Sequence, residues 1–336
     1  MLLTLKVPHD LQGRLAVSSY VYQPALARAL SVKLHVCTRY LDSDLFAPLI
    51  PKPQTASSSI TLIMPKSVLI TGCSSGIGHA LALDFNQRGL RVFATARNKE
   101  SISDLAEQGI ETFSLEVTDP ASIQTLQEDI FVKTVGKLDI LVNNAGRNYT
   151  VPALDIDMDE VRATFDTNLF AVMKMCQTFA PLLLESKGTI VQIGSLAGVL
   201  PYVFGSVYNA SKAALHSYSD ALRVELAPFG VRVVTIVTGG VISNIGRTTR
   251  TLPEDSIYLP LAEEYQARQT HSQVVGMSNE DYAKSVVTQV LAGRKDVVWE
   301  GGKSWLAWFV HSFLPTSVMV SPLQYLEVLV RLSNVT

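Results

Sequence analysis

A glycine-rich turn constrains this chain more than any other feature of its sequence. The stretch "SVLITGCSSGIGHALA", Ser67 to Ala82, starts with an apolar run typical of a short buried strand, Val68–Ile70. An alanine- and leucine-rich helical pattern follows from Ile77 to Gln87. The turn between strand and helix contains the glycines Gly72, Gly76 and Gly78. Because glycine lets a ligand approach the main chain, and because a helix start presents unpaired N–H groups, the turn is a candidate phosphate site.

The spacing of these glycines narrows the kind of phosphate site. It is Gly-x3-Gly-x-Gly, which differs from the G-x-G-x-x-G dinucleotide fingerprint and from the Gly-Lys-Ser/Thr of a P-loop. No lysine within the turn could reach a terminal phosphate, so the pattern disfavours an ATPase. By itself the turn also fits a ligand-free connection between a strand and a helix, and other residues must decide.

Composition limits the partners and the compartment. The 28 Lys and Arg residues balance 30 Asp and Glu residues, which gives no indication of a nucleic-acid partner. The scattered cysteines Cys37, Cys73 and Cys176 form neither a disulfide framework nor a metal site, and they fit a reducing compartment. We therefore expect an intracellular, cytoplasmic protein without a bound metal.

Three regions are predicted along the 336 residues. Residues 1–63 show no alternation of strands and helices and contain the linker-like stretch "PKPQTASSS". They are expected to form a poorly ordered extension or to lie upstream of the true start. Residues 64–302 form the predicted folded domain, which begins at Met64 directly before the first strand. Residues 303–336 form an apolar tail.

Strand-like and helix-like segments alternate from Ser67 onward, which predicts an α/β fold with a parallel sheet covered on both faces. After the first strand, further strands are expected at 91–96, 110–117, 138–146, 188–195 and 231–240. Helical patterns lie at 121–132, 158–184 (two helices) and 207–227. In such a sheet a ligand binds beyond the carboxyl ends of the strands. Polar or glycine residues follow these ends at Arg97, "NNAG" (143–146), Ser195 and Thr238–Gly240.

The run "YNASK" places Tyr208 and Lys212 four residues apart, on one face of the predicted helix. Ser195 lies thirteen residues upstream of the tyrosine, at the end of a strand. Reduction of a ketone by hydride leaves an alkoxide that needs a proton from a positioned acid. A lysine cation beside a tyrosine lowers the tyrosine pKa, and a serine hydroxyl can donate to the substrate oxygen. The constellation therefore predicts a carbonyl reductase with Tyr208 as the acid.

Taken together, these motifs resemble those of the short-chain dehydrogenase/reductase family over about residues 66–300. The matching segments are the turn Thr71–Gly78, "NNAG" at 143–146, Ser195, Tyr208 to Lys212, and Asn168 in "DTNLF". The resemblance implies a Rossmann-like, doubly wound parallel sheet of about seven strands with helices on both faces. It further implies four catalytic residues, with Tyr208 as the proton donor in reduction and Ser195 beside it. Lys212 would also hold the nicotinamide ribose, and Asn168 would support a water-linked proton path.

The same resemblance implies contacts with a dinucleotide. The expected cofactor-binding residues are Gly72, Ser74, Ser75, Gly76, Ile77, Gly78, Arg97, Glu116, Val117, Asn143, Asn144, Ala145, Gly146, Tyr208, Lys212, Gly239, Val241 and Ser243. Arg97 follows the second strand with no acidic residue beside it. An arginine there accommodates a 2′-phosphate, whereas an acid would bind a free 2′-hydroxyl. We therefore expect NADP(H), with a solvated surface arginine as the alternative.

Two departures from the usual family pattern bear on the substrate. The run "TGGV", Thr238 to Val241, replaces the common Pro-Gly, and Glu116 stands where an aspartate usually meets the adenine. The first departure and the "TGCSSGIG" turn resemble the fungal acyldihydroxyacetone phosphate reductases, which implies reduction of a lipid-linked or polyketide-like ketone to a secondary alcohol. The hydroxysteroid dehydrogenases share that turn, so a steroid or retinoid substrate stays open, as does a non-catalytic NADP-sensing module.

Two further segments have open alternatives. Residues 242–278 form either a mobile lid over the substrate, carrying Tyr258, Leu259, Leu261 and Tyr265, or an ordinary pair of surface helices. The aromatic stretch 304–320 is shorter than a bilayer span and suits either a membrane–water interface or packing on the body or another subunit. The membrane would be that of the endoplasmic reticulum or a lipid droplet. The family resemblance also implies a homodimer or homotetramer formed through helices at 169–184 and 207–227.

Overall fold

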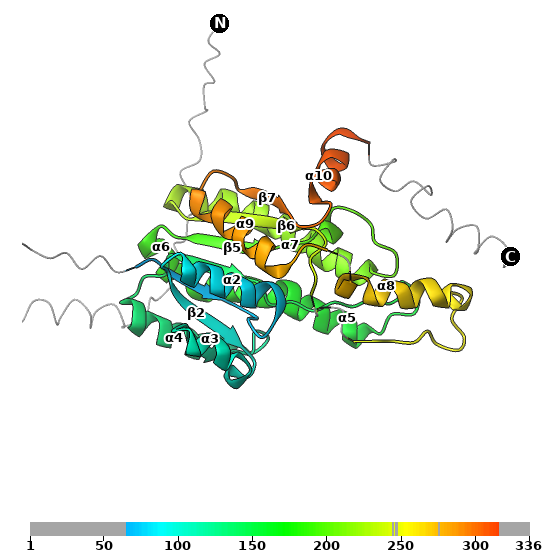
Figure 1. The fold of residues 1–336 in the computed structure, drawn as a ribbon, viewed down its shortest axis with the longest axis horizontal. Helices are drawn as coiled ribbons and strands as arrows, with labels where there is room; N and C mark the ends of the chain where they lie inside the picture. The colour runs from blue at the N-terminus through cyan, green and yellow to red at the C-terminus, as the bar shows by residue number, and fades with distance from the viewer. Residues whose placement is uncertain (1–64, 244, 246–247, 275, 316–336) are drawn as a thin grey trace, which may run out of the picture. The chain divides into compact units, whose positions relative to one another are not determined.

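A seven-stranded parallel sheet organises the described part of the chain, which in this computed structural model comprises residues 65–243, 245, 248–274 and 276–315 (Figure 1). The predicted extension 1–63 and the end of the apolar tail lie outside the described residues. The strand order is β3-β2-β1-β4-β5-β6-β7, and neighbouring strands pair in parallel. The strands are β1 (Ser67–Ile70), β2 (Arg91–Ala96), β3 (Glu111–Ser114), β4 (Ile140–Asn143), β5 (Thr189–Ile193), β6 (Arg232–Thr238) and β7 (Val297–Glu300). The predicted doubly wound Rossmann-like sheet is confirmed.

The strands expected from the sequence are found, most of them shorter than expected. β2 has the predicted bounds, whereas β3 ends at Ser114 although its apolar pattern continued to 117. The chain turns away there because the Asp119 N–H donates to the Glu116 carbonyl oxygen at 3.1 Å. Residue patterns did not locate β7 or the short helices η1 (Lys99–Ile102) and α3 (Ser103–Glu107).

Apolar side chains on both faces of the strands explain why helices cover both faces. In β1, Val68 and Ile70 join one buried cluster, whereas Leu69 points the other way and joins a second. The helices α2 (Gly76–Gln87) and α9 (Asn279–Ala292) cover the first cluster and pack against each other, as Figure 1 shows. The second cluster is covered by α4 (Pro120–Thr134), α6 (Ala171–Ser186) and α7 (Ser206–Leu226).

The direction in which the sheet grows reverses beside β1, because β2 lies on one side of it and β4 on the other. Such a reversal leaves a crevice at the carboxyl ends of the two central strands. Thr71 follows β1, and its hydroxyl oxygen accepts hydrogen bonds from the backbone N–H groups of Asn144 and Ala145, both at 3.0 Å. The glycine turn and the "NNAG" run are therefore tied together at the predicted edge of the sheet.

The two helices expected over 158–184 are joined by a π-helical turn. α5 (Met158–Phe165) runs into η2 (Asp166–Phe170), and α6 continues directly from it. Single π-turns are frequent at functional sites, because the extra residue redirects a side chain. Here the turn carries Asn168, one of the predicted catalytic residues, whose side chain is buried.

The segment over 242–278 was expected to form either a lid or a pair of surface helices. Its described residues contain the short 3₁₀ helix η6 (Leu259–Leu261) and one longer helix, α8 (Ala262–Val274). Two of the apolar residues expected in a lid, Leu261 and Tyr265, are buried against Phe204. The Tyr265 hydroxyl also donates to the Thr150 carbonyl oxygen at 3.0 Å. α8 is thus anchored on the loop that precedes α7.

The start of the predicted tail forms α10 (Ser304–Phe313), which lies next to β7. Ala307 is buried with Leu196 and Val237, so one face of α10 packs on the body. Its aromatic side chains point away from that contact, with Trp305 71% and Phe313 63% exposed. None of the described helices combines the length and the apolar composition needed to cross a bilayer.

Candidate active site

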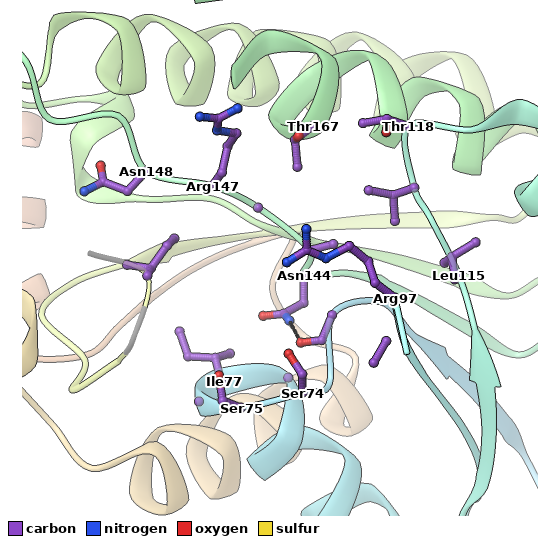
Figure 2. Close-up of a pocket in the computed structure, with 18 of the residues that line it drawn as sticks. Ser74, Ser75, Ile77, Arg97, Leu115, Thr118, Asn144, Arg147, Asn148 and Thr167 are labelled. Carbon is purple, nitrogen blue, oxygen red and sulfur yellow. Dashed lines mark hydrogen bonds between the residues drawn. The ribbon is translucent and has the colours of Figure 1, made fainter. Parts of the chain in front are cut away.

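A cavity of about 590 Å³ opens at the carboxyl ends of β1, β2, β3 and β4 (Figure 2). Thirteen of the predicted cofactor-binding residues line it: Gly72, Ser74, Ser75, Gly76, Ile77, Gly78, Arg97, Glu116, Val117, Asn144, Ala145, Gly146 and Ser243. Residues that the sequence analysis did not select also line it: Ala96, Leu115, Thr118, Arg147, Asn148, Ala163, Asp166, Thr167, Ile245 and Thr248. The cavity is therefore built by the loops after these four strands, by residues of the segment after β6, and by one face of α5 and η2.

The glycine turn is a close-packed backbone cradle. Gly72 has φ +73°, and a Cβ added there would lie 2.9 Å from the Ala145 Cα atom. A Cβ on Gly78 would lie 2.3 Å from the Asn144 side-chain nitrogen and 2.4 Å from the Gly72 carbonyl oxygen. That nitrogen donates to the carbonyl oxygens of Thr71 and Gly72 at 2.9 and 3.0 Å. Only residues without a side chain fit at these two positions.

The start of α2 faces this cavity, and no capping or acidic side chain there competes with a ligand for the backbone N–H groups. Its N-cap residue, Ser75, makes no side-chain capping hydrogen bond, and no acidic residue occupies the first turn. The unpaired N–H groups of the first turn and the helix dipole therefore favour an anion in the cavity. A dinucleotide pyrophosphate has the size and charge that fit this cradle, so the residues present suit the predicted cofactor.

Five predicted cofactor residues do not line the cavity: the catalytic pair Tyr208 and Lys212, and also Asn143, Gly239 and Val241. The Asn143 amide lies beneath it, buried, and donates to the Gln192 side-chain oxygen at 3.1 Å. The Gly239 N–H donates to the Glu300 carbonyl oxygen at 2.7 Å, so this glycine allows β6 and the end of β7 to approach closely. Val241 is buried within the cluster under α2 and α9. The geometry therefore indicates no direct contact with the cofactor for Asn143, Gly239 and Val241.

Two arginines border the cavity, and they differ in their partners (Figure 2). Arg147 forms an ion pair with Glu160. Arg97 is exposed, and none of the carboxylates in the described residues forms an ion pair with it. Glu116 is engaged locally, since its carboxylate accepts from the Thr118 hydroxyl at 2.8 Å. Of these two arginines, Arg97 is thus the one in a position to bind a further phosphate group of the ligand.

The predicted catalytic residues come together beside this cavity. Tyr208 and Lys212 share one face of α7, and the Lys212 ammonium nitrogen lies 5.9 Å from the centroid of the Tyr208 ring. The Ser195 side chain lies close enough to the Tyr208 hydroxyl to lower the pKa of the tyrosine. A Cβ added to Gly146, which lines the cavity, would lie 3.3 Å from the Asn168 side-chain oxygen and 3.9 Å from the Lys212 nitrogen. Both polar atoms therefore border the cavity at the same point.

The electrostatic relation between the tyrosine and the lysine differs from the expectation. Burial raises the pKa of Tyr208, and the hydrogen bond from Ser195 and the charge of Arg268 lower it in part. Lys212 is 5% exposed, and burial lowers its pKa to about 8. Its ammonium group donates to the Ile193 carbonyl oxygen at 2.9 Å, and Lys212 is not among the groups that shift the Tyr208 pKa. The predicted lowering of the tyrosine pKa by Lys212 is therefore not seen in this arrangement.

Ser195 is held by a histidine that the sequence analysis missed. The Ser195 backbone N–H donates to His216 Nε2 at 3.2 Å, which requires that this nitrogen carry no proton. Burial lowers the pKa of His216 to about 4, so the imidazole stays neutral at physiological pH. A Cβ on Gly194 would lie 2.2 Å from Nε2, and one on Gly198 would lie 2.7 Å from Nδ1. The glycines on either side of Ser195 thus make room for the ring.

Asn168 is fixed by three hydrogen bonds and is not free to rotate. Its side-chain oxygen accepts from the Arg147 N–H at 2.9 Å, and its nitrogen donates to the Arg147 carbonyl oxygen and the Ser211 hydroxyl, both at 3.0 Å. Ser211 was not selected from the sequence, although it lies within the "YNASK" run. Within the described residues, no group of three or more His, Cys, Asp or Glu side chains could hold a metal ion.

Comparison with known proteins places these motifs in context. The model of the family described as short chain dehydrogenase matches residues 66–253. The short-chain dehydrogenase srdE of Neurospora crassa is 45% identical over 257 residues, which are 75% of this chain and 89% of that protein. The NADPH-dependent 1-acyldihydroxyacetone phosphate reductase of Schizosaccharomyces pombe is 46% identical over 202 residues, 58% of this chain and 68% of that protein. The crystal structure of a short-chain dehydrogenase from Streptomyces avermitilis is similar with a TM-score of 0.66 at 28% identity, covering 79% of this chain and 97% of the other.

Proposed function

The chain belongs to the short-chain dehydrogenase family, and from this premise we propose that it is an NADPH-dependent reductase that converts a ketone to a secondary alcohol. The observation that carries the proposal is that the Ser195 side chain lies close enough to the Tyr208 hydroxyl to lower its pKa, with the buried Lys212 ammonium on the same helix face. An acid, a second hydroxyl donor and a cation thus surround one point at the rim of the dinucleotide cavity.

These side chains divide the work of reduction between them. When bound, the nicotinamide cofactor supplies the hydride. The Tyr208 hydroxyl gives its proton to the carbonyl oxygen as negative charge develops there, and the raised pKa keeps the hydroxyl protonated until that moment. The Ser195 hydroxyl stabilises the same oxygen by a hydrogen bond. Lys212 lies on the same helix face as Tyr208, and we assign it the role of holding the nicotinamide ribose.

The proposed choice of NADPH over NADH depends on Arg97. This exposed arginine follows β2 at the cavity, where a 2′-phosphate would add two negative charges, and no acidic residue stands beside it. The Schizosaccharomyces pombe relative is named as NADPH-dependent, which supports the choice. We expect Arg97→Ala to lower kcat/KM for NADPH about tenfold or more, because one charge-assisted contact is lost, and to leave kcat/KM for NADH unchanged.

Steady-state kinetics with both cofactors checks the prediction for Arg97. Arg294→Ala, at another exposed arginine outside the cavity, is the matched control and should alter neither value. Comparable efficiency of the native protein with the two cofactors, unaffected by Arg97→Ala, would mean that Arg97 is a solvated surface residue.

The proposed substrate class is a lipid-linked or polyketide-like ketone. The name of the Schizosaccharomyces pombe relative describes a reductase of an acylated ketone, and the likeness to that protein supports this class. The direct test is a screen of ketones with the purified full chain, followed by NADPH absorbance. Turnover of long-chain aliphatic ketones above steroid and retinal substrates supports the proposal. Preference for a steroid or retinoid would assign the other class, and binding of NADPH without turnover of any carbonyl compound would indicate a sensing module.

We also propose that α10 contacts a membrane surface of the endoplasmic reticulum or a lipid droplet. The helix has no Asp, Glu, Lys or Arg, and Trp305, Trp308, Phe309 and Phe313 are 71%, 45%, 47% and 63% exposed. Aromatic side chains of this kind favour the interface between lipid and water. We expect the native chain to float with neutral phospholipid vesicles in a density gradient, and the double variant Trp305→Ser, Trp308→Ser to float several-fold less.

The control for flotation is Phe131→Ser, which removes an equally exposed aromatic side chain from α4. Loss of flotation only in the α10 variant supports a membrane contact. Equal flotation of all three proteins, or of none, contradicts it.

The predicted homodimer or homotetramer is part of the same proposal. Apolar side chains are exposed on η2, α6 and α7, where Phe170 is 53%, Leu184 40% and Val224 75% exposed. A second copy of the chain packed against these helices would cover them, as the family resemblance implies.

A further inference from the structure

A guanidinium group on α8, that of Arg268, lies over an aromatic ring and near enough to the catalytic tyrosine to affect its pKa. The Arg268 guanidinium carbon lies 5.1 Å from the centroid of the Tyr202 ring. Tyr202 belongs to the loop between Ser195 and α7. Its carbonyl oxygen accepts from the Asn209 side chain and from the Gly205 N–H, both at 3.2 Å. The loop is thereby fixed to the first turn of α7, the helix that carries Tyr208, so Tyr202 links Arg268 to the start of that helix.

The charge of Arg268 reaches the reacting hydroxyl. It lowers the pKa of Tyr208 and that of Tyr202, in both cases against the larger effect of burial. Lys212, by contrast, is directed toward the Ile193 carbonyl oxygen. Arg268 is therefore a cation whose field acts on the Tyr208 hydroxyl.

Arg268 is half-buried, and no carboxylate of the described residues forms an ion pair with it. The neighbouring arginine of the same segment, Arg250, is paired with Glu160 at 3.1 Å. A partly desolvated guanidinium gains much from an anion, and its planar donors fit a phosphate or a carboxylate in a bidentate manner. The guanidinium lies over the Tyr202 ring, and its planar donors can bind an anion along the edge of the group.

We propose that Arg268 is a specificity-determining residue that binds an anionic group, a phosphate or a carboxylate, carried by the ketone substrate. The inference deepens the proposed reductase function and rests on it. The Tyr202 ring orients the guanidinium, and α8 presents it beside the point where Tyr208 and Ser195 bind the carbonyl oxygen. The substrate then spans from the catalytic hydroxyls to this cation, while its apolar part extends away.

The test uses two pairs of ketones that differ only in charge. One pair is 1-acyldihydroxyacetone phosphate and the dephosphorylated 1-acyldihydroxyacetone, and the other is a long-chain 3-oxo acid and its methyl ester. The full chain is compared with Arg268→Gln, Arg268→Lys and the control Arg294→Gln, which removes an exposed arginine elsewhere. We expect Arg268→Gln to raise KM for the charged ketone about 10- to 100-fold, with kcat changed less, and to change KM for its neutral partner less than threefold. Arg268→Lys should restore part of the affinity, and the pair that responds identifies the anion as a phosphate or a carboxylate.

Equal losses for charged and neutral ketones, or no loss, would overturn the proposal, since Arg268 would then only shape the pocket. A binding measurement keeps the inference testable if no ketone is reduced. With the dinucleotide site saturated by NADP⁺, hexyl phosphate or hexanoate should raise the Tm of the native chain more than hexanol does. That difference should disappear in Arg268→Gln and persist in Arg294→Gln. Binding that depends on Arg268 without turnover would contradict the reductase function alone, whereas turnover without discrimination by charge would contradict the role of Arg268 alone.

Discussion

Tyr208→Phe is expected to lower the rate of ketone reduction by about 10²- to 10⁴-fold, the usual contribution of a positioned general acid. The variant keeps the aromatic ring and therefore its contact with the Lys212 ammonium, 5.9 Å from the ring centroid. It removes only the hydroxyl, which provides the proton and lies near the Ser195 side chain. The affinity for NADPH should change little, because Tyr208 does not line the cavity that is expected to hold the pyrophosphate. Oxidation of NADPH followed by absorbance gives kcat, and a fluorescence titration gives the Kd for NADPH.

The matched control is Tyr218→Phe on the same helix. Tyr218 packs with the cluster on the opposite face of the sheet from α2, and its hydroxyl interacts with the Cys176 thiol. Removal of this hydroxyl should leave kcat within a few-fold of the native value. If Tyr208→Phe retained more than a tenth of the native rate, the proton would have to come from another group, and the assignment of Tyr208 as the acid would be wrong.

The sequence predicted the central part of the fold because that part depends on local patterns. β2 runs from Arg91 to Ala96 as expected, and α2 begins one residue before the predicted start. In a parallel sheet the strands are buried on both faces and appear as apolar runs, which makes them easy to locate. β7 has only four residues, with Val297 exposed, and it is stabilised by pairing with β6, so no local pattern marks it.

Site residues that belong to one local motif could be selected from the sequence. Contacts between segments that are distant in the sequence were missed. The glycine turn and the "YNASK" run lie where they were expected. The contact of His216 with the Ser195 N–H and the stacking of Arg268 on Tyr202 depend on how helices pack on loops. The sequence did contain one signal for the His216 contact. Glycines stand on both sides of Ser195, at Gly194 and Gly198, and they could have indicated that a ring packs against this loop.

The expected effect of Lys212 on the pKa of Tyr208 is not found in the structure, for the same reason. Spacing places two side chains on one helix face, but it does not determine which atoms they meet. The Ile193 carbonyl oxygen at the end of β5 binds the ammonium group, and burial dominates the pKa of the phenol. Only the tertiary structure contains this information.

Gly78→Ala tests whether the backbone of the turn, and not only its charge, forms the cofactor site. The added methyl group would lie 2.4 Å from the Gly72 carbonyl oxygen and 2.3 Å from the Asn144 amide nitrogen, so the turn and the "NNAG" segment must separate. Overpacking of this kind costs about 1–3 kcal/mol, and the two hydrogen bonds of the Asn144 amide would be weakened as well. We expect a lower Tm and an NADPH affinity reduced about 10- to 100-fold, since each 1.4 kcal/mol corresponds to about tenfold in Kd.

Gly109→Ala separates the loss of stability from the loss of binding. Gly109 has φ +80° and no heavy atom within 4 Å of an added Cβ, so the substitution strains the backbone by about 1–2 kcal/mol without any steric contact. Its Tm should fall by an amount similar to that of Gly78→Ala, while its Kd for NADPH should equal the native value. In Asn144→Ala the amide is absent, yet Gly78→Ala should still weaken binding in that background, because the Gly72 carbonyl oxygen cannot move aside as a side chain can. If Gly78→Ala bound NADPH as tightly as the native chain, the close approach of helix and turn would have no role in holding the pyrophosphate, and the cavity would have to bind the dinucleotide through Arg97 and the loops after β3 and β4.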